Sequence, residues 1–291
     1  MKTNQSVRFL KGVLAGMLTA VLALACVSAK AAHELIYAVD VNNNLVKFYS
    51  DTPGTIFEAH AINGLQLNEE IRGLDSWEGI LYGLGSSSRL YTIDPNTGAA
   101  TQIGAGQFSP LLNGQVFGFD HDGLTGLRVV SPQAQNLVID QSTGVATAGP
   151  TNMYVLGDVN YGKPPVVSGL AYNMYTGQWF AADYGINSLA SFNPATGGLS
   201  TLGPIGFDVA RLNGMDVSPD TGIMYLISAA TSSDPQGNLY FFHGTVFQLV
   251  GQVGFPGDEG LYRALTVAPE PSSIALLGLG ALGLMLARRR Q

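Results

Sequence analysis

Short segments in which apolar and polar residues alternate, separated by turns rich in Asp, Asn, Thr and Gly, fill the chain between Leu35 and Val267. Alternation with a period of two is typical of β-strands with one buried face, and this region has no amphipathic helical pattern. Three turns of similar sequence, Asp94–Gly98, Asp140–Gly144 and Asn193–Gly197, each join two such segments. Asp or Asn at the first position and Gly at the last are typical of tight turns. These segments therefore predict β-hairpins.

A second pair of strands precedes each hairpin, so the repeating unit contains four strands. Its first strand has Gly two positions before an Asp or a small residue, as in Ile71–Asp75, Val116–Asp120, Val167–Ala171 and Leu212–Asp216. The starts of these units are 45, 51 and 45 residues apart. Four-stranded repeats of about 40–50 residues are the signature of propeller blades.

The two ends of the repeat region supply one further blade. Three strands follow one another from Leu35 to Ala59, and a single strand, Leu261–Val267, lies at the other end. One strand plus three make a blade that closes the ring and removes exposed sheet edges. The sequence thus predicts an all-β fold, a five-bladed β-propeller of four-stranded blades over residues 35–267. A six-bladed propeller or an open β-solenoid would need further strands within Gln102–Asn113 and Thr151–Pro165.

Residues 1–31 are predicted to form a secretory signal peptide. Three cationic residues precede the apolar segment Gly12–Cys26, and Ala29 and Ala31 form an A-x-A cleavage site. The alternatives are an uncleaved membrane helix and a lipoprotein anchored through Cys26. Because Cys26 is the single cysteine of the chain, the exported domain would have no disulfide.

Residues 268–291 combine three features in a fixed order: Pro269-Glu270-Pro271, an apolar run from Ile274 to Ala287, and Arg288, Arg289 and Arg290. The run is short for an independent membrane span, which takes about 20 residues. The arginines indicate a cytoplasmic end. This layout closely resembles the PEP-CTERM sorting signal of Gram-negative bacteria. The resemblance implies a transmembrane sorting helix that anchors the chain transiently in the inner membrane. It also implies removal of the tail by an exosortase, and a secreted or cell-surface protein.

The segments Ser88–Gly98, Phe117–Asp120 and Leu127–Ser131 carry a second resemblance, which extends over nearly the whole repeat region. They are similar to a bacterial family of secreted domains of unknown function that often carry PEP-CTERM tails. The sequence departs from the family's usual pattern after Asp120, where His121 follows. Because that family has no assigned activity, the resemblance implies a fold and a location only.

The charge of the chain excludes one class of partner. The formal net charge is −7, and seven of the 14 Lys and Arg residues lie in the two terminal segments. The domain between them is therefore strongly acidic. It has no electrostatic reason to bind nucleic acid or an anionic membrane surface.

Three carboxylates, Asp75, Asp120 and Asp216, occupy the same position in three repeats, where they would face a central channel. Two carboxylates that flank a sugar bond could hydrolyse it. A repeated residue is more typical of a scaffold that caps turns or binds the backbone of the next blade. Arg72 and Arg263 also share one repeat position. They could bind an anionic sugar, and pairing with carboxylates across blade seams is the simpler interpretation.

No cofactor is expected, although one segment could bind calcium. Asp40–Asn44 and Asp51 offer oxygen ligands at the spacing of a calcium loop, but Leu45 stands where that loop needs Gly. A polar hairpin turn is the favoured interpretation. Several tyrosines, Tyr172 among them, could stack on sugars or lie half-buried in strands.

No asymmetric catalytic set is evident in the sequence. The leading hypothesis is therefore a non-enzymatic, exported propeller of the cell surface or extracellular matrix that binds polysaccharide, such as exopolysaccharide, or a surface protein. The rival hypothesis is an extracellular carbohydrate-active hydrolase or lyase that uses the channel carboxylates.

Overall fold

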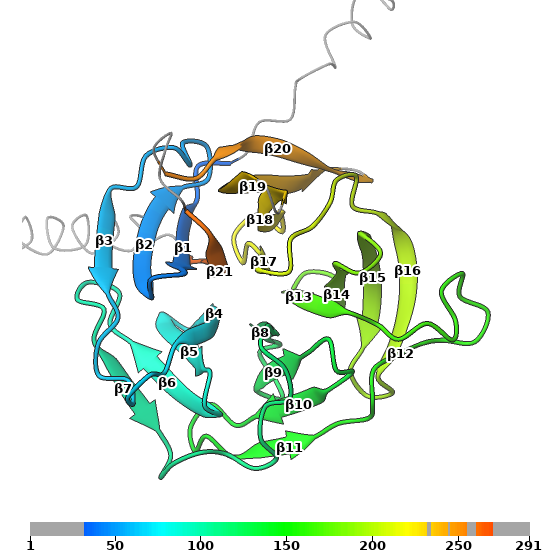
Figure 1. The fold of residues 1–291 in the computed structure, drawn as a ribbon, viewed down its shortest axis with the longest axis horizontal. Helices are drawn as coiled ribbons and strands as arrows, with labels where there is room; N and C mark the ends of the chain where they lie inside the picture. The colour runs from blue at the N-terminus through cyan, green and yellow to red at the C-terminus, as the bar shows by residue number, and fades with distance from the viewer. Residues whose placement is uncertain (1–31, 232–233, 244, 255–259, 270–291) are drawn as a thin grey trace, which may run out of the picture. The chain divides into compact units, whose positions relative to one another are not determined.

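The computed structural model describes residues 32–231, 234–243, 245–254 and 260–269. These residues form five β-sheets arranged in a ring (Figure 1). Blade one contains β21 (Tyr262–Val267), β1 (Leu35–Asp40), β2 (Asn44–Tyr49) and β3 (Glu58–Ala61). Blade two contains β4 (Ile71–Trp77), β5 (Ile80–Gly85), β6 (Arg89–Ile93) and β7 (Ala100–Ile103). Blade three contains β8 (Gly118–His121), β9 (Leu127–Val130), β10 (Asn136–Ile139) and β11 (Ala146–Ala148).

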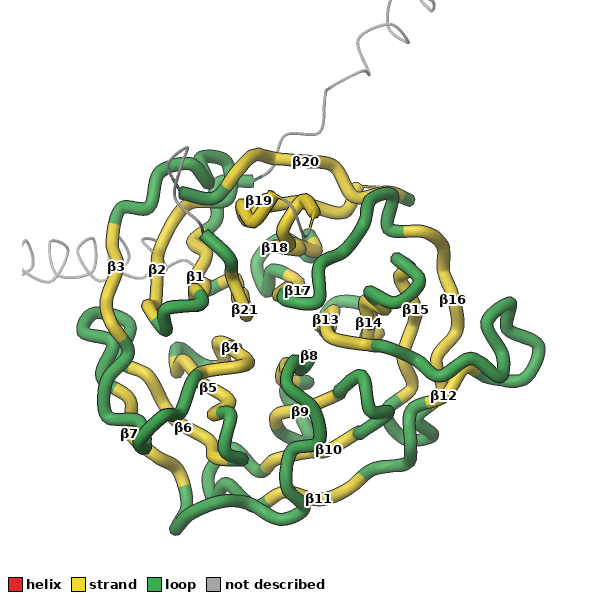
Figure 2. The backbone as a smooth tube through the Cα atoms, in the orientation of Figure 1, coloured by secondary structure: helices red, strands yellow, loops and turns green. Residues whose placement is uncertain are grey.

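Blades four and five complete the ring. Blade four contains β13 (Val167–Asn173), β14 (Gln178–Asp183), β15 (Ser188–Asn193) and β16 (Gly198–Pro204), with β12 (Met153–Tyr154) at its outer edge. Blade five contains β17 (Asn213–Val217), β18 (Met224–Thr231), β19 (Asp234–His243) and β20 (Val246–Gln252). The first strand of each blade lies nearest the central axis, as the tube view also shows (Figure 2). The prediction of a five-bladed propeller is confirmed.

The ring is closed within blade one, where strands from the two ends of the domain pair. The innermost strand β21 runs antiparallel to β1, with Ile36 opposite Val267 and Ala38 opposite Leu265. This arrangement was predicted from the lone strand at the end of the repeats. It gives blade one the same four-stranded order as its neighbours, so the ring closes without a free inner edge.

The stretch between the third and fourth blades differs from a plain connection. It contains β12, which pairs parallel to β16, with Met153 opposite Gly198 and Tyr154 opposite Leu199. This strand is an additional outer strand of blade four and does not start a sixth blade. The six-bladed and open-solenoid alternatives are therefore both wrong. The outermost strand of blade one is also displaced from its predicted position, since β3 begins at Glu58 and not at Thr55.

The three similar turns join the two outer strands of blades two, three and four. Asp140 accepts hydrogen bonds from the hydroxyl group of Ser142, from the backbone N–H and hydroxyl groups of Thr143, and from the backbone N–H group of Ser142, and these bonds lower its pKa to about 2. Gly144 has a φ of 69°, a left-handed conformation that favours glycine. A Cβ atom on Gly144 would lie 2.8 Å from the carbonyl oxygen of Ile103 in the preceding blade. A Cβ atom on Gly98 would likewise lie 2.6 Å from the carbonyl oxygen of Ala61 in β3, so these two turns also pack against the outer strand of the preceding blade.

The hydrophobic core lies between adjacent blades. Leu84 and Leu90 of blade two are fully buried against Leu127, Val129 and Leu137 of blade three. Similar clusters join blades one and two, and blades four and five. Alternation along each strand sends apolar side chains to both faces of a buried sheet, so every blade is packed on two sides.

The described residues contain strands, turns and loops but no helix, and among them no membrane-crossing helix is found. The predicted signal peptide and sorting helix fall outside this part of the chain, as do Ala29, Ala31, Glu270, Pro271, Arg288, Arg289 and Arg290. Pro269 is an exposed residue just after β21.

Candidate axial carboxylate site

One residue from the first strand of each blade forms a ring around the propeller axis. The five positions are equivalent in the repeat and belong to blades one to five in the order Thr266, Asp75, Asp120, Ala171 and Asp216. The three carboxylates predicted as channel candidates are therefore brought together. The ring is asymmetric, because blade one contributes a hydroxyl group and blade four a methyl group.

Two of these carboxylates bind the backbone of the next blade. Asp120 accepts a hydrogen bond of 2.5 Å from the N–H group of Tyr172 in blade four. Asp216 accepts one of 2.7 Å from the N–H group of Val267, and one of 2.9 Å from the hydroxyl group of Thr266 in blade one. Each also accepts a bond of 2.6 Å from the N–H group of the residue that follows it. The carboxylates thus join the seams between blades, as a repeated scaffold residue should.

The three side chains lie so close that their charges interact strongly. A carboxylate oxygen from each lies within 4.8 Å of the others, and all three residues are buried. Burial raises the pKa of Asp75 to about 7. Burial and the charge of Asp75 raise the pKa of Asp216 to about 8, and burial with both neighbouring carboxylates raises the pKa of Asp120 well above its ordinary value. Three such groups cannot all be ionised near neutral pH unless a cation or protons compensate them.

A small cavity of about 30 Å³ lies beside the carboxylates on one side of the ring. Trp77 and His121 line this cavity and stack with their ring centroids 4.6 Å apart. Tyr172, Met174 and Pro219 complete its wall. The space has room for about one or two water molecules. It is too small for a sugar ring.

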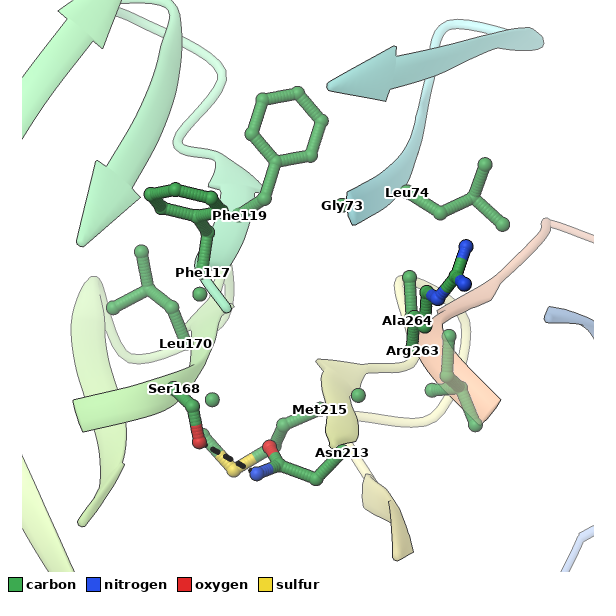
Figure 3. Close-up of a pocket in the computed structure, with 14 residues that line it drawn as sticks. Gly73, Leu74, Phe117, Phe119, Ser168, Leu170, Asn213, Met215, Arg263 and Ala264 are labelled. Atoms are coloured by element: carbon green, nitrogen blue, oxygen red, sulfur yellow. Dashed lines mark hydrogen bonds between the residues drawn. The ribbon is translucent and has the colours of Figure 1, made fainter. Parts of the chain in front are cut away.

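The other side of the ring is closed by the glycines that recur two positions before it (Figure 3). A Cβ atom on Gly214 would lie 2.3 Å from the backbone nitrogen of Leu265, and one on Gly73 would lie 2.5 Å from the Cβ atom of Phe119. Glycine therefore lets the innermost strands approach one another at the axis. The cavity left there is only about 10 Å³, so the channel is plugged at this level.

Arg72 and Arg263 lie three positions before the carboxylate ring, on the far side of this plug. Arg263 lines the plugged cavity (Figure 3). Both guanidinium groups pair with Glu70, at 2.5 Å for Arg72 and 3.1 Å for Arg263. Arg263 also donates to the carbonyl oxygen of Val41. The structure thus brings these two arginines together but keeps them apart from the aspartates.

The calcium-loop residues do not form one site. Asp40 accepts hydrogen bonds from the N–H groups of Asn42 and Asn44 and from the side chain of Asn44, which is a capped hairpin turn. Asp51 lies beyond the other end of β2, where it pairs with His33 at 2.8 Å. The length of the strand therefore separates the two carboxylates.

A larger hollow, of about 520 Å³, opens on blade four. Tyr172 and Trp179 contribute aromatic surface, with ring centroids 5.0 Å apart, and Gln178, Asn193 and Ser200 contribute polar groups. Sequence reasoning had marked Tyr172 as a stacking candidate but missed the hollow, because its lining comes from separate strands and a turn.

Two family comparisons agree with this architecture. Residues 44–243 match the model of the family described as Domain of unknown function (DUF4394). The chain belongs to this family. Residues 267–290 match the PEP-CTERM protein-sorting motif, which is a substrate signal for exosortase-type sorting machinery. This family member is therefore an exported bacterial protein that is sorted to the cell envelope.

No match was found among the curated proteins. Among solved structures, YCF48 bound to D1 peptide is similar at 14% identity and a TM-score of 0.39, covering 76% of this chain and 64% of that one. The Nidogen/Laminin complex is similar at 11% identity and a TM-score of 0.48, covering 82% and 99%. The Myxococcus xanthus glutaminyl cyclase is similar at 13% identity and a TM-score of 0.46, covering 76% and 97%. The chain thus spans less than two thirds of the first of these, and at such scores none of them bears on its activity.

Proposed function

We propose that this chain is a non-catalytic binding propeller of the Gram-negative cell surface or extracellular matrix, and that it binds polysaccharide in the hollow on blade four. The observation that carries the proposal is the hollow itself, about 520 Å³ of open space with aromatic and amide side chains in its wall. Sugars present apolar faces that stack on aromatic rings and hydroxyl groups that pair with amides and hydroxyls. An N-terminal signal peptide and a transient inner-membrane anchor complete the proposed route.

The dimensions of the axial site support a role without catalysis. Glycoside hydrolysis uses two carboxyl groups about 5–10 Å apart on either side of the sugar bond. Here one oxygen atom of each carboxylate lies within 4.8 Å of the other two, and the cavity beside them is about 30 Å³. A polysaccharide chain has no room between them.

Co-sedimentation of the purified full-length chain with the host's exopolysaccharide tests the proposal. We expect binding, which Tyr172→Ala or Gln178→Ala weakens about ten-fold, since the loss of one stacking or hydrogen-bonding contact costs about 1.4 kcal/mol. Tyr161→Ala is the matched control, because Tyr161 is 58% exposed and lies outside the hollow. Shortening of the polysaccharide would favour the hydrolase or lyase. Binding that is equal in all three variants would exclude the hollow.

A further inference from the structure

One carboxylate oxygen at the propeller axis is buried without a partner. Asp75 is only 4% exposed, and its Oδ2 atom has no hydrogen-bond partner. Asp120 and Asp216 face it from two other blades, so that one oxygen atom of each side chain lies within 4.8 Å of the other two. A buried, unpartnered carboxylate oxygen next to two further carboxylates is unfavourable unless something positive lies between them.

We propose that Asp75, Asp120 and Asp216 together bind one calcium ion on the axis of the propeller. Two oxygen ligands at about 2.4 Å from a common Ca²⁺ lie at most about 4.8 Å apart, which is the span within which these three atoms lie. The ligand set consists of carboxylate oxygens, which suit a hard cation. The adjoining cavity of about 30 Å³ leaves space for water ligands that complete the six to eight oxygens calcium takes.

The neighbouring groups are compatible with this assignment. The bonds that Asp120 and Asp216 accept from backbone N–H groups fix the orientation of both carboxylates. Both oxygen atoms of Asp120 and the Oδ1 atom of Asp216 accept one hydrogen bond each, so each keeps a further lone pair for a metal, whereas Asp216 Oδ2 accepts two. Thr266 donates to Asp216 and so holds that side chain from blade one. Since the three ligands belong to blades two, three and five, one bound ion would link three of the five blades directly.

Calcium binding to this site stabilises the folded chain by mass action. For the full-length chain, purified in detergent and stripped with EDTA, we expect Tm at pH 8 to rise by about 5–10 °C at a calcium concentration 100-fold above Kd. Magnesium at the same concentration gives a smaller shift, because it demands shorter bonds and retains its water. A shift with magnesium as large as that with calcium would overturn the choice of ion. No shift with either would overturn the site and leave shared protons as its compensation.

Two matched variants locate the ion. Asp75→Asn removes one charged ligand but also relieves repulsion in the stripped protein, so we expect it to fold and to lose the calcium-dependent rise in Tm. Asp51→Asn is the same substitution at the other calcium candidate of the sequence, and it keeps the rise. The proposal fails if Asp75→Asn still responds like the unaltered chain or if Asp51→Asn abolishes the response.

A terbium ion, which replaces calcium on oxygen ligands, supplies a readout independent of stability. Trp77 lines the cavity beside the carboxylates, so excitation of tryptophan should give terbium emission that added calcium displaces. We expect Asp75→Asn to abolish this emission and Asp51→Asn to retain it. Calcium-sensitive emission of undiminished strength in Asp75→Asn would place the ion elsewhere.

Discussion

The contact between Glu34 and blade five provides a quantitative test of how the ring is held shut. Glu34 precedes β1 and is 4% exposed. Its carboxylate accepts hydrogen bonds from the hydroxyl groups of Ser218, Thr221 and Tyr225, with a distance of 3.0 Å for Thr221. Ser218 and Tyr225 are fully buried, so removal of the carboxylate leaves their hydroxyl groups inside the protein.

Glu34→Ala leaves at least two buried hydroxyl groups without an acceptor. Each unsatisfied group costs about 1–3 kcal/mol, so we expect a loss of about 4 kcal/mol in the free energy of unfolding. For a domain of this size the corresponding fall in Tm is about 8–16 °C. Glu34→Gln keeps one oxygen acceptor, so its Tm should lie between that of Glu34→Ala and that of the unaltered chain.

Differential scanning calorimetry of the full-length chain measures the effect, and near-UV circular dichroism checks that the variants fold. Glu78→Ala, at an exposed position, serves as the control and should change Tm by less than about 2 °C. If Glu34→Ala changed Tm no more than this control, the carboxylate would contribute nothing to closure and the reasoning would be refuted.

Three further predictions concern the axial aspartates, the glycine plug behind them and the strand β12. In EDTA the pKa values of Asp75 and Asp216 in the folded chain, about 7 and about 8, exceed those of the same groups in the unfolded chain. The two protonated carboxyl groups therefore contribute fully to the free energy of unfolding below about pH 4, and this contribution is lost as the pH rises towards 8. Calorimetry should therefore give a lower Tm at pH 8.5 than at pH 5.5, and an unchanged Tm would contradict the assignment. Gly214→Ala, which forces a Cβ atom against backbone, should prevent folding or cost several kcal/mol, whereas Gly106→Ala meets no atom within 4 Å and should be neutral in urea unfolding. Tyr154→Phe removes one 2.8 Å hydrogen bond to the buried carboxylate of Asp183, which contributes about 1.5–3 kcal/mol, so Tm should fall by about 3–12 °C. An unchanged Tm would show that β12 is not held by this hydroxyl group.

Much of the fold follows from local sequence. The turns at Asp94, Asp140 and Asn193 and the strand periodicity locate the blades, because both depend on residues close together in the chain. The recurring glycine two positions before Asp75 or its equivalents also marked the innermost strands. The reason for that glycine, however, lies in the neighbouring blade: only the closed ring shows that Gly214 faces the backbone of Leu265.

The sequence predicted which residues belong to the candidate site but not their geometry. Repetition identified Asp75, Asp120 and Asp216 as channel residues. Their distances, the plug behind them and the small cavity beside them depend on how tightly five strands meet at the axis. The strand β12 was missed as a feature of blade four, because a two-residue strand has too few positions to show a period.

The position of β21 has a consequence for the order of events during export. This strand is innermost in blade one, and the matched sorting motif starts at its last residue, 267. If the proposed signal peptide starts export at the N-terminus, four complete blades cross the membrane before the strand that closes the ring. Until then the inner edge of β1 is open and the axial ring lacks Thr266. The last strand of the domain and the sorting motif are therefore exported together. The sorting machinery can bind the motif only when the propeller can first fold completely.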